Sequence, residues 1–185
     1  MEKTTLVFEK VRPSDAEAGH VISDMAPARR ERFLQLKNRE QRAQYAASTR
    51  ALERALFEFT GDGNAYLSFR YGQNGRPETD GAQVSLAHTD AMAACAAGRA
   101  AVGVDIERRD RKFSAALTKR VPTLDDWLAL EACVKMTGEG LAALRKYVRV
   151  GDEMRDADGN RVACLKYVDI GEYRAAVCCA EEFEI

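Results

Sequence analysis

The sequence predicts an α+β fold made of two similar α/β halves that meet near Gly98. Three observations lead to this prediction. The 185 residues suffice to bury one large core or two small cores that pack together. An order of strand, helices and strands occurs once on each side of Gly98. No linker or low-complexity segment separates the two runs, so we expect residues 1–98 and 99–185 to be closely packed halves.

The first half begins with a strand and continues with helices. Residues 4–11 alternate as a strand does, and residues 27–59 have helical spacing with a break near Asn38. We then expect a strand over 65–71, a Gly- and Pro-containing loop over 72–81 and a short strand over 83–87.

The second half is expected to follow a pair of apolar strands. These strands, 91–97 and 100–107, are joined by Gly98-Arg99, which predicts a tight turn. Thr123 with Asp126 three residues later is similar to a capping box and predicts a helix over 124–136 that ends at Gly138. Further strands are expected over 147–150, 153–156, 162–169 and 173–179, with Asp158-Gly159 as a hairpin turn.

Charge and hydropathy exclude several classes of function. The chain has 28 basic and 29 acidic residues, so no overall field favours a nucleic acid or a membrane surface. Charged residues near the start exclude an ordinary signal peptide, and Gly98 and Arg99 interrupt the longest apolar stretch. We therefore expect a cytoplasmic protein without a nucleic-acid or membrane partner.

Cysteine and histidine usage points away from a disulfide framework or a zinc site. The five cysteines have no CxxC spacing and lie in apolar segments, which favours buried, reduced thiols. His20 and His88 are the only histidines. Chemistry is therefore expected from carboxylates, lysines and arginines.

Two carboxylates end the second apolar strand. Asp105 and Glu107 are two residues apart, so both side chains leave the strand on one face. Such a pair favours a divalent cation with oxygen ligands, such as Mg²⁺. The alternative is a strand end that simply reaches solvent beside Arg108 and Arg109.

A second candidate group lies on the predicted helix. Trp127, Glu131 and Lys135 are spaced four residues apart and share one stripe. A Glu–Lys pair at this spacing is often surface decoration, but Gly138 and Gly140 follow it and permit another molecule to approach the helix end.

Candidate anion ligands lie in the first half. Arg50 and Arg54 share a helix face that is suited to a phosphate, although a solvated face is the favoured interpretation for most basic residues of 27–59. Arg76 projects from the Gly75-Arg76-Pro77 turn, and His88 and Thr89 end a strand. A structural hydrogen bond is the alternative role for His88.

Taken in order, these segments resemble the 4′-phosphopantetheinyl transferase superfamily, specifically its longer, two-halved monomeric branch of the surfactin-synthetase-activating type. The similarity covers roughly residues 29–141. Its elements are Gly75-Arg76-Pro77, the segment Ser85 to Thr89, the unaltered GVDIE motif of residues 103–107, and Trp127 through Glu131, Lys135 and Gly138-Glu139-Gly140-Leu141.

The resemblance implies a fold with two halves related by a pseudo-two-fold, and Mg²⁺-dependent transfer of phosphopantetheine from coenzyme A to a serine of an apo acyl or peptidyl carrier protein. It assigns Asp105, Glu107 and Glu131 to Mg²⁺, and catalysis to Glu131 and Lys135. It assigns the phosphates of coenzyme A to a set of basic and hydroxyl side chains: Arg50, Arg76, His88, Thr89 and Lys135.

Three positions depart from the family pattern. Leu130 replaces a lysine before the helix glutamate, Ala87 replaces a serine before the histidine, and Thr89 replaces the serine after it. These departures keep open a non-catalytic relative that binds coenzyme A or a carrier protein. A metal-dependent phosphoesterase is a third reading, because it needs only carboxylates and arginines.

Overall fold

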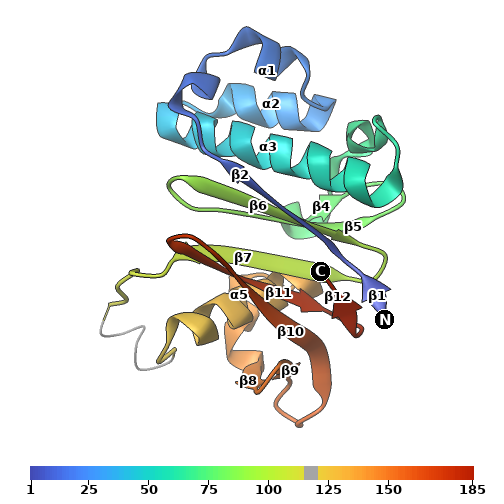
Figure 1. Ribbon diagram of the computed structural model, residues 1–185, viewed down its shortest axis with the longest axis vertical. Coiled ribbons are helices and arrows are strands. Elements are labelled where there is room, and N and C mark those ends of the chain that lie inside the picture. Colours follow the sequence, from blue (N-terminus) through green and yellow to red (C-terminus); the bar gives the residue numbers. More distant parts are fainter. Residues whose placement is uncertain (115–120) are drawn as a thin grey trace.

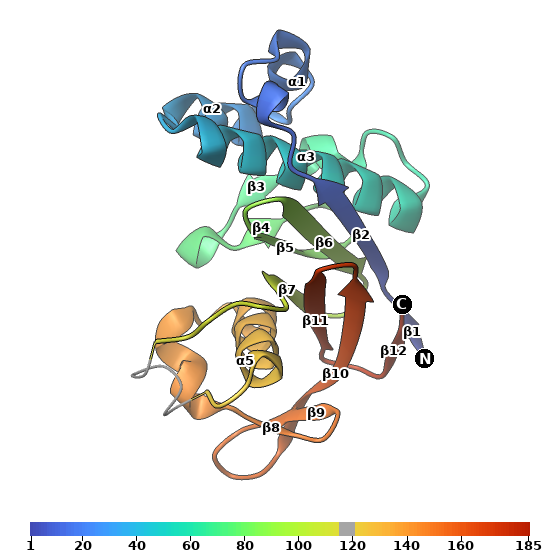
Figure 2. The ribbon, with the colours of Figure 1, turned by 60° about the vertical axis from the view of Figure 1, so that its left-hand side comes forward.

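The computed structural model describes residues 1–114 and 121–185, and it confirms the mixed helix-and-sheet composition. The elements form four layers in the order helix, sheet, sheet, helix (Figure 1). Helix α3 (Arg39–Thr60) covers the first sheet, and helix α5 (Leu124–Thr137) covers the second. Figure 2 shows the same layers from another side.

The first sheet and its helices come from the first half of the chain. Its antiparallel strands are β2 (Thr5–Lys10), β6 (Met92–Gly98) and β5 (Gln83–His88), in that order. Asn38 begins α3 as its side chain accepts hydrogen bonds from the backbone of Glu40 and Gln41, which explains the predicted break. Three short helices precede α3: η1 (Pro13–Ala16), α1 (Gly19–Ser23) and α2 (Pro27–Gln35).

The second sheet is antiparallel and has five strands. In spatial order these are β7 (Val102–Arg108), β11 (Tyr173–Cys179), β10 (Arg161–Ile170), β9 (Glu153–Arg155) and β8 (Val148–Val150). The predicted start and end of α5 are confirmed: the Thr123 hydroxyl accepts from the Asp126 backbone, and Gly138 has a φ of 74°. Near the two termini, β1 (Glu2–Lys3) pairs in parallel with β12 (Phe183–Glu184).

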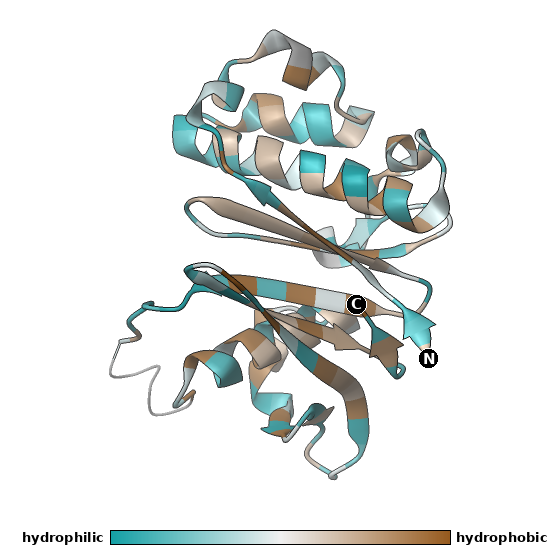
Figure 3. Ribbon diagram, viewed as in Figure 1, coloured by the Kyte–Doolittle hydropathy of each residue, from teal (hydrophilic) through white to brown (hydrophobic). Residues whose placement is uncertain are grey.

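Small apolar side chains bring the two sheets together. Strand β6 is buried along its whole length and reads Met-Ala-Ala-Cys-Ala-Ala-Gly. Its alternate faces pack against α3 and against β7 and β11, whose Val104, Ile106 and Val177 are fully buried. The hydrophobic colouring of the central strands follows this packing (Figure 3).

The predicted hairpin at Gly98-Arg99 is wrong. Strand β6 uses one edge to pair with β2 and the other to pair with β5, so it has no edge left for β7. Strand β7 pairs instead with β11, and the connection at Gly98 carries the chain from one sheet to the other. Sequence patterns identify both strands but carry no information on which edge is already occupied.

The strand predicted over 65–71 is also mostly wrong. Residues Ala65–Ser68 form the 3-10 helix η2, in which the Ser68 hydroxyl donates to the Ala65 carbonyl oxygen over 2.7 Å. Only β3 (Arg70–Tyr71) is extended, and it pairs with β4 (Pro77–Glu78) inside the predicted loop. The sequence also gave no indication of η3 (Gln73–Gly75) or η4 (Leu141–Lys146).

The cysteines are mostly buried, as predicted. Cysteines 95, 133, 178 and 179 are buried, and Cys164 is half-buried. In the described ranges, no helix has the length and apolar character needed to cross a membrane.

Candidate functional site

A cleft of about 440 Å³ lies where the two halves of the chain face each other. Helices α2 and α3, the turn before β4 and strand β5 supply one wall, and α5 with the glycines after it supplies the other. The first wall contains Arg29, Arg76 and His88, and the second contains Glu131 and Lys135. The cleft therefore has one basic wall and one wall of mixed charge.

Gly103 sets the position of the second wall. A Cβ at this position would lie 2.6 Å from the Met136 backbone nitrogen and closer still to the carbonyl oxygen of Ala132, so only glycine lets α5 pack directly on β7. Asp105 leaves the same face of β7 two residues later. The strand carboxylate is thereby brought beneath Glu131 and Lys135 of the helix.

Lys135 links the two carboxylates. Its Nζ donates to Asp105 Oδ1 over 2.6 Å and lies 3.9 Å from Glu131 Oε2. Asp105 is only 6% exposed, and its Oδ2 has no hydrogen-bond partner among the described residues. A buried carboxylate oxygen without a donor is costly, so it marks a place suited to a bound cation or donor.

Burial dominates the electrostatics of Glu131. Desolvation raises the pKa of this carboxyl, and the negative charge of Asp105 raises it further, while Lys135 and Arg111 oppose the shift. Glu131 is therefore a stronger base than a carboxylate in water, as a group that accepts a proton from a hydroxyl should be.

Glu107 does not join this group. Its carboxylate forms an ion pair with Arg111 four residues later, and the Arg111 guanidinium lies over the rings of Trp127 and Phe113 at 5.2 and 5.3 Å. Within residues 1–114 and 121–185, no three His, Cys, Asp or Glu side chains are grouped to hold a metal by themselves.

Asp105 and Glu131 nevertheless fit Mg²⁺ as a pair. This ion is usually held by one or two carboxylates together with substrate phosphates and water. The buried Oδ2 of Asp105, which has no partner among the described residues, would be a ligand atom on the protein side.

Arg29 dominates the basic wall. It is only 3% exposed, and it donates to the hydroxyls of Ser48 and Thr49 and to the carbonyl oxygen of Tyr45. Its guanidinium also lies 3.9 Å from the centre of the Tyr45 ring. Burial lowers its pKa, and no carboxylate pairs with it in the described part of the chain. A buried cation without an acidic partner is suited to an incoming anion.

Arg76 and His88 complete this wall, where the sequence placed them. Arg76 packs directly against Gly138, since a Cβ there would lie 3.2 Å from Arg76 Cδ. His88 is exposed to solvent in the free protein, yet the surrounding walls desolvate its ring and lower its pKa; the charges of Lys135 and Arg29 lower it further, and Asp105 opposes the shift. These surroundings favour the neutral form of the His88 ring.

The cleft continues into a second hollow of about 500 Å³. Both hollows share Tyr45, Tyr71, Gly75 and His88, and the hydroxyls of Tyr45 and Tyr71 are hydrogen-bonded to each other. Arg32, Gln41 and Gln44 line the second hollow but not the first. The combined volume suits a ligand larger than a simple phosphate.

Arg50 and Thr89 lie outside the cleft, contrary to their assignment. Arg50 binds the carboxylate of Asp15 and the carbonyl oxygen of Lys10, because its face of α3 is turned to η1 and β2. The Thr89 hydroxyl donates to Asp90 over 2.9 Å in the turn after β5.

The departures from the family pattern also have definite places. Leu130 is 9% exposed and lines a separate hollow with Trp127, Leu144 and Tyr147. Ala87 is buried in the core between the sheets.

Sequence reasoning missed Arg29, Tyr45 and Ser48. One signal for Arg29 was present: it lies in the first turn of a helix that begins at Pro27 and has no acidic residue there. A cation is disfavoured at this end of a helix, so a buried one there indicates another role.

Comparison of the sequence with models of known protein families found no match, and comparison with curated proteins found none either.

Proposed function

We propose that this protein transfers 4′-phosphopantetheine from coenzyme A to a serine of an acyl or peptidyl carrier protein, in a Mg²⁺-dependent reaction. One observation carries the proposal. Glu131 and Lys135 line the cleft above the buried Asp105 and face Arg29, which pairs with no carboxylate in the described part of the chain. A site for two negatively charged phosphate groups and a reacting hydroxyl needs both features.

The basic wall supports binding of the phosphates. Arg29, Arg76 and His88 converge on one cleft and supply guanidinium and ring N–H donors. Arg32 lines the adjoining hollow and extends the positive charge toward the place where a 3′-phosphate would lie. On this proposal Tyr45 and Tyr71 face the nucleoside.

The wall of mixed charge, formed by α5 above Asp105, supports the chemical step. Glu131 accepts the proton of the carrier serine, whose oxygen forms a bond to the β-phosphorus as the bond to the leaving oxygen breaks. Lys135, once released from Asp105, neutralises the departing 3′,5′-adenosine bisphosphate. Mg²⁺ held by Asp105 and Glu131 would supply charge neutralisation of the diphosphate. The protein otherwise contributes positioning, as in other phosphoryl transfers.

The layered architecture fits the same proposal. Each half places one long helix on the outer face of an antiparallel sheet, and the cleft lies between the halves. On this basis we propose the pseudo-two-fold arrangement of the family and a monomer whose site is complete in one chain. A cytoplasmic location follows only from the proposed reaction with a carrier protein.

The test is intact-mass spectrometry of a purified apo carrier protein after incubation with this protein, coenzyme A and Mg²⁺. The expected result is a mass gain of one phosphopantetheine that EDTA prevents. Absence of this gain with acyl and peptidyl carriers alike, despite folded protein, would reject the proposal.

A second function, binding of coenzyme A or a carrier without transfer, is favoured by Leu130. This side chain lies in a separate hollow with Trp127 and Arg145 and does not line the cleft, and it supplies no ammonium where the family pattern has a lysine. Binding of coenzyme A with no transfer would select this alternative. Release of phosphopantetheine without an acceptor would instead indicate a phosphoesterase.

A further inference from the structure

The two carboxylates of β7 leave the same face of the strand but have different surroundings. Asp105 is buried beside Lys135, and within residues 1–114 and 121–185 its Oδ2 has no hydrogen-bond partner. Glu107 lies at the strand end, and its charge is already matched by Arg111. A divalent ion at Glu107 would compete with Arg111 for the carboxylate; an ion at Asp105 would compete with Lys135 but would also meet an oxygen that has no partner among the described residues.

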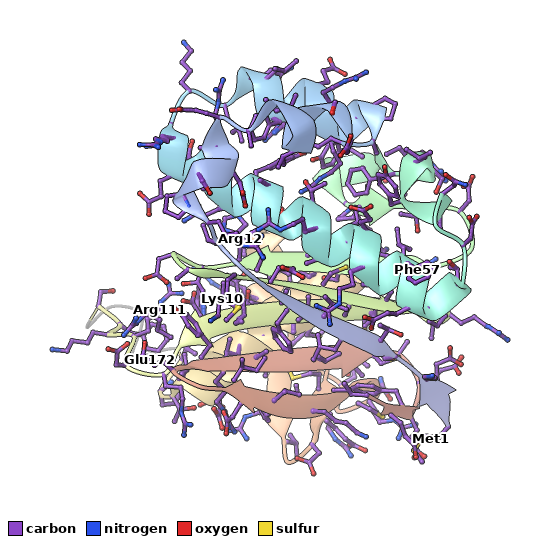
Figure 4. All side chains as sticks on the ribbon, turned by 45° about the horizontal axis from the view of Figure 1, so that its top comes forward. Met1, Lys10, Arg12, Phe57, Arg111 and Glu172 are labelled. Carbon is purple, nitrogen blue, oxygen red and sulfur yellow. The ribbon has the colours of Figure 1, made fainter. Side chains whose placement is uncertain are left out.

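Arg111 is fixed by more than this ion pair. It lies where β7 ends, at the edge of the molecule (Figure 4). Its guanidinium lies 5.2 Å from the centre of the Trp127 ring and 5.3 Å from that of Phe113, and the two rings are 5.9 Å apart. Cation–π contacts of this kind attract the guanidinium to the two rings and add to the ion pair.

Trp127 connects this contact to the proposed active site. It belongs to the first turns of α5, one turn before Glu131, so both side chains lie on one stripe of the helix. A chain of contacts therefore runs from Glu107 through Arg111 and Trp127 to the turn that carries Glu131.

We propose that Glu107 is a positioning residue and not a metal ligand: with Arg111 it holds the start of α5 so that Glu131 faces Asp105. The expected effect on kcat rests on the proposed function. It differs from the role that the family resemblance assigns to Glu107. Metal binding then depends on Asp105 and Glu131, and loss of either member of the Glu107–Arg111 pair acts through the helix.

The test is a double-mutant cycle with Glu107→Gln, Arg111→Met and the double variant. Mn²⁺ affinity is measured by electron paramagnetic resonance in the presence of coenzyme A, and acrylamide quenching is measured on Trp127, the only tryptophan. Glu58→Gln is the matched control, because Glu58 forms another Arg–Glu pair at the same spacing, with Arg54 on α3.

All three variants should show the same increase in Trp127 quenching and the same fall in kcat of about tenfold, with little change in the KM for coenzyme A. Arg111→Lys should restore only part of the loss, because an ammonium keeps the charge but not the planar contact. The control should match the wild type.

If Glu107 were a metal ligand, the two single variants would change Mn²⁺ affinity in different ways, and that result would overturn the proposal. Glu107→Gln would then weaken Mn²⁺ binding as strongly as Asp105→Asn, while Arg111→Met would leave it unchanged or strengthen it. Unchanged Trp127 quenching in Glu107→Gln would also overturn it. If the wild type binds no Mn²⁺ with coenzyme A, the proposed function fails, and the quenching cycle still decides whether the pair positions α5.

Discussion

The two walls of the cleft are assembled in different ways. The wall with Asp105, Glu131 and Lys135 comes from one strand and one helix that pack directly on each other. The opposite wall takes Arg29 from α2, Arg76 from the turn before β4 and His88 from β5. The first wall depends on local periodicity, and the second depends on how distant segments fold together.

The walls also differ in charge balance. Lys135 pairs with Asp105 at the second wall, whereas Arg29 is buried among hydroxyls and aromatic rings and meets no acid in the part of the chain that the structure describes. In the free protein the wall of β7 and α5 therefore keeps the negative charge of Glu131, whereas the opposite wall is cationic through Arg29 and Arg76. We therefore expect the two walls to respond differently to substitution.

The largest effect is expected from Asp105→Asn, which breaks the reacting wall. Transfer should fall by about a hundredfold to a thousandfold, because Asp105 supplies the free oxygen for Mg²⁺ and the partner of Lys135. Steady-state transfer rates with rising Mg²⁺ measure this loss. Full activity of Asp105→Asn would show that β7 carries no part of the reaction.

The next largest effect is expected at Gly103, where α5 packs directly on β7. Gly103→Ala should destabilise the protein by about 2–4 kcal/mol, because the added methyl group meets the backbone of α5. Urea unfolding followed by circular dichroism measures it. Gly98→Ala is the matched control, since a Cβ there would be 3.4 Å from the Thr4 hydroxyl, and it should have a much smaller effect.

Arg29→Met tests the binding wall. Coenzyme A affinity should fall by about tenfold to a hundredfold, while the melting temperature should stay the same or rise, because a buried unpaired cation is replaced by an apolar side chain. Titration calorimetry and thermal unfolding check both parts. Arg50→Met serves as the control outside the cleft and should leave coenzyme A affinity unchanged.

The smallest effect is expected from Glu131→Gln in the absence of metal, where the substitution should raise thermal stability at neutral pH. The folded state raises the pKa of Glu131, so it binds this proton more tightly than the unfolded state does, and the ionised carboxylate lowers stability at neutral pH. The variant should melt about 2–4 °C higher at about pH 7.5. The difference should vanish as the pH falls below about 4, where both states are protonated.

A gain in melting temperature that persists at low pH would contradict this account of the Glu131 pKa. Such a result would place the cause in packing and not in ionisation.

Sequence reasoning predicted the wall of β7 and α5 better than the opposite wall. The spacing of Asp105 in its strand and of Glu131 and Lys135 in their helix places these side chains on definite faces, and the caps at Thr123 and Gly138 fix the helix. The placement of Arg76 and His88 in one cleft agrees with expectation.

The rest depends on tertiary placement. Arg50 and Arg29 are both helical arginines, and only the packing of α2 and α3 decides which one meets Asp15 and which one meets the cleft. The partners of β6 and β7 likewise depend on edges that are already occupied.

The division of roles between the walls is tested most directly with Glu131→Gln. Coenzyme A binding is measured by titration calorimetry, and transfer to an apo carrier is measured by intact-mass spectrometry on the same sample. The account predicts coenzyme A affinity within about threefold of the wild type together with no detectable transfer. Wild-type transfer by Glu131→Gln would contradict it.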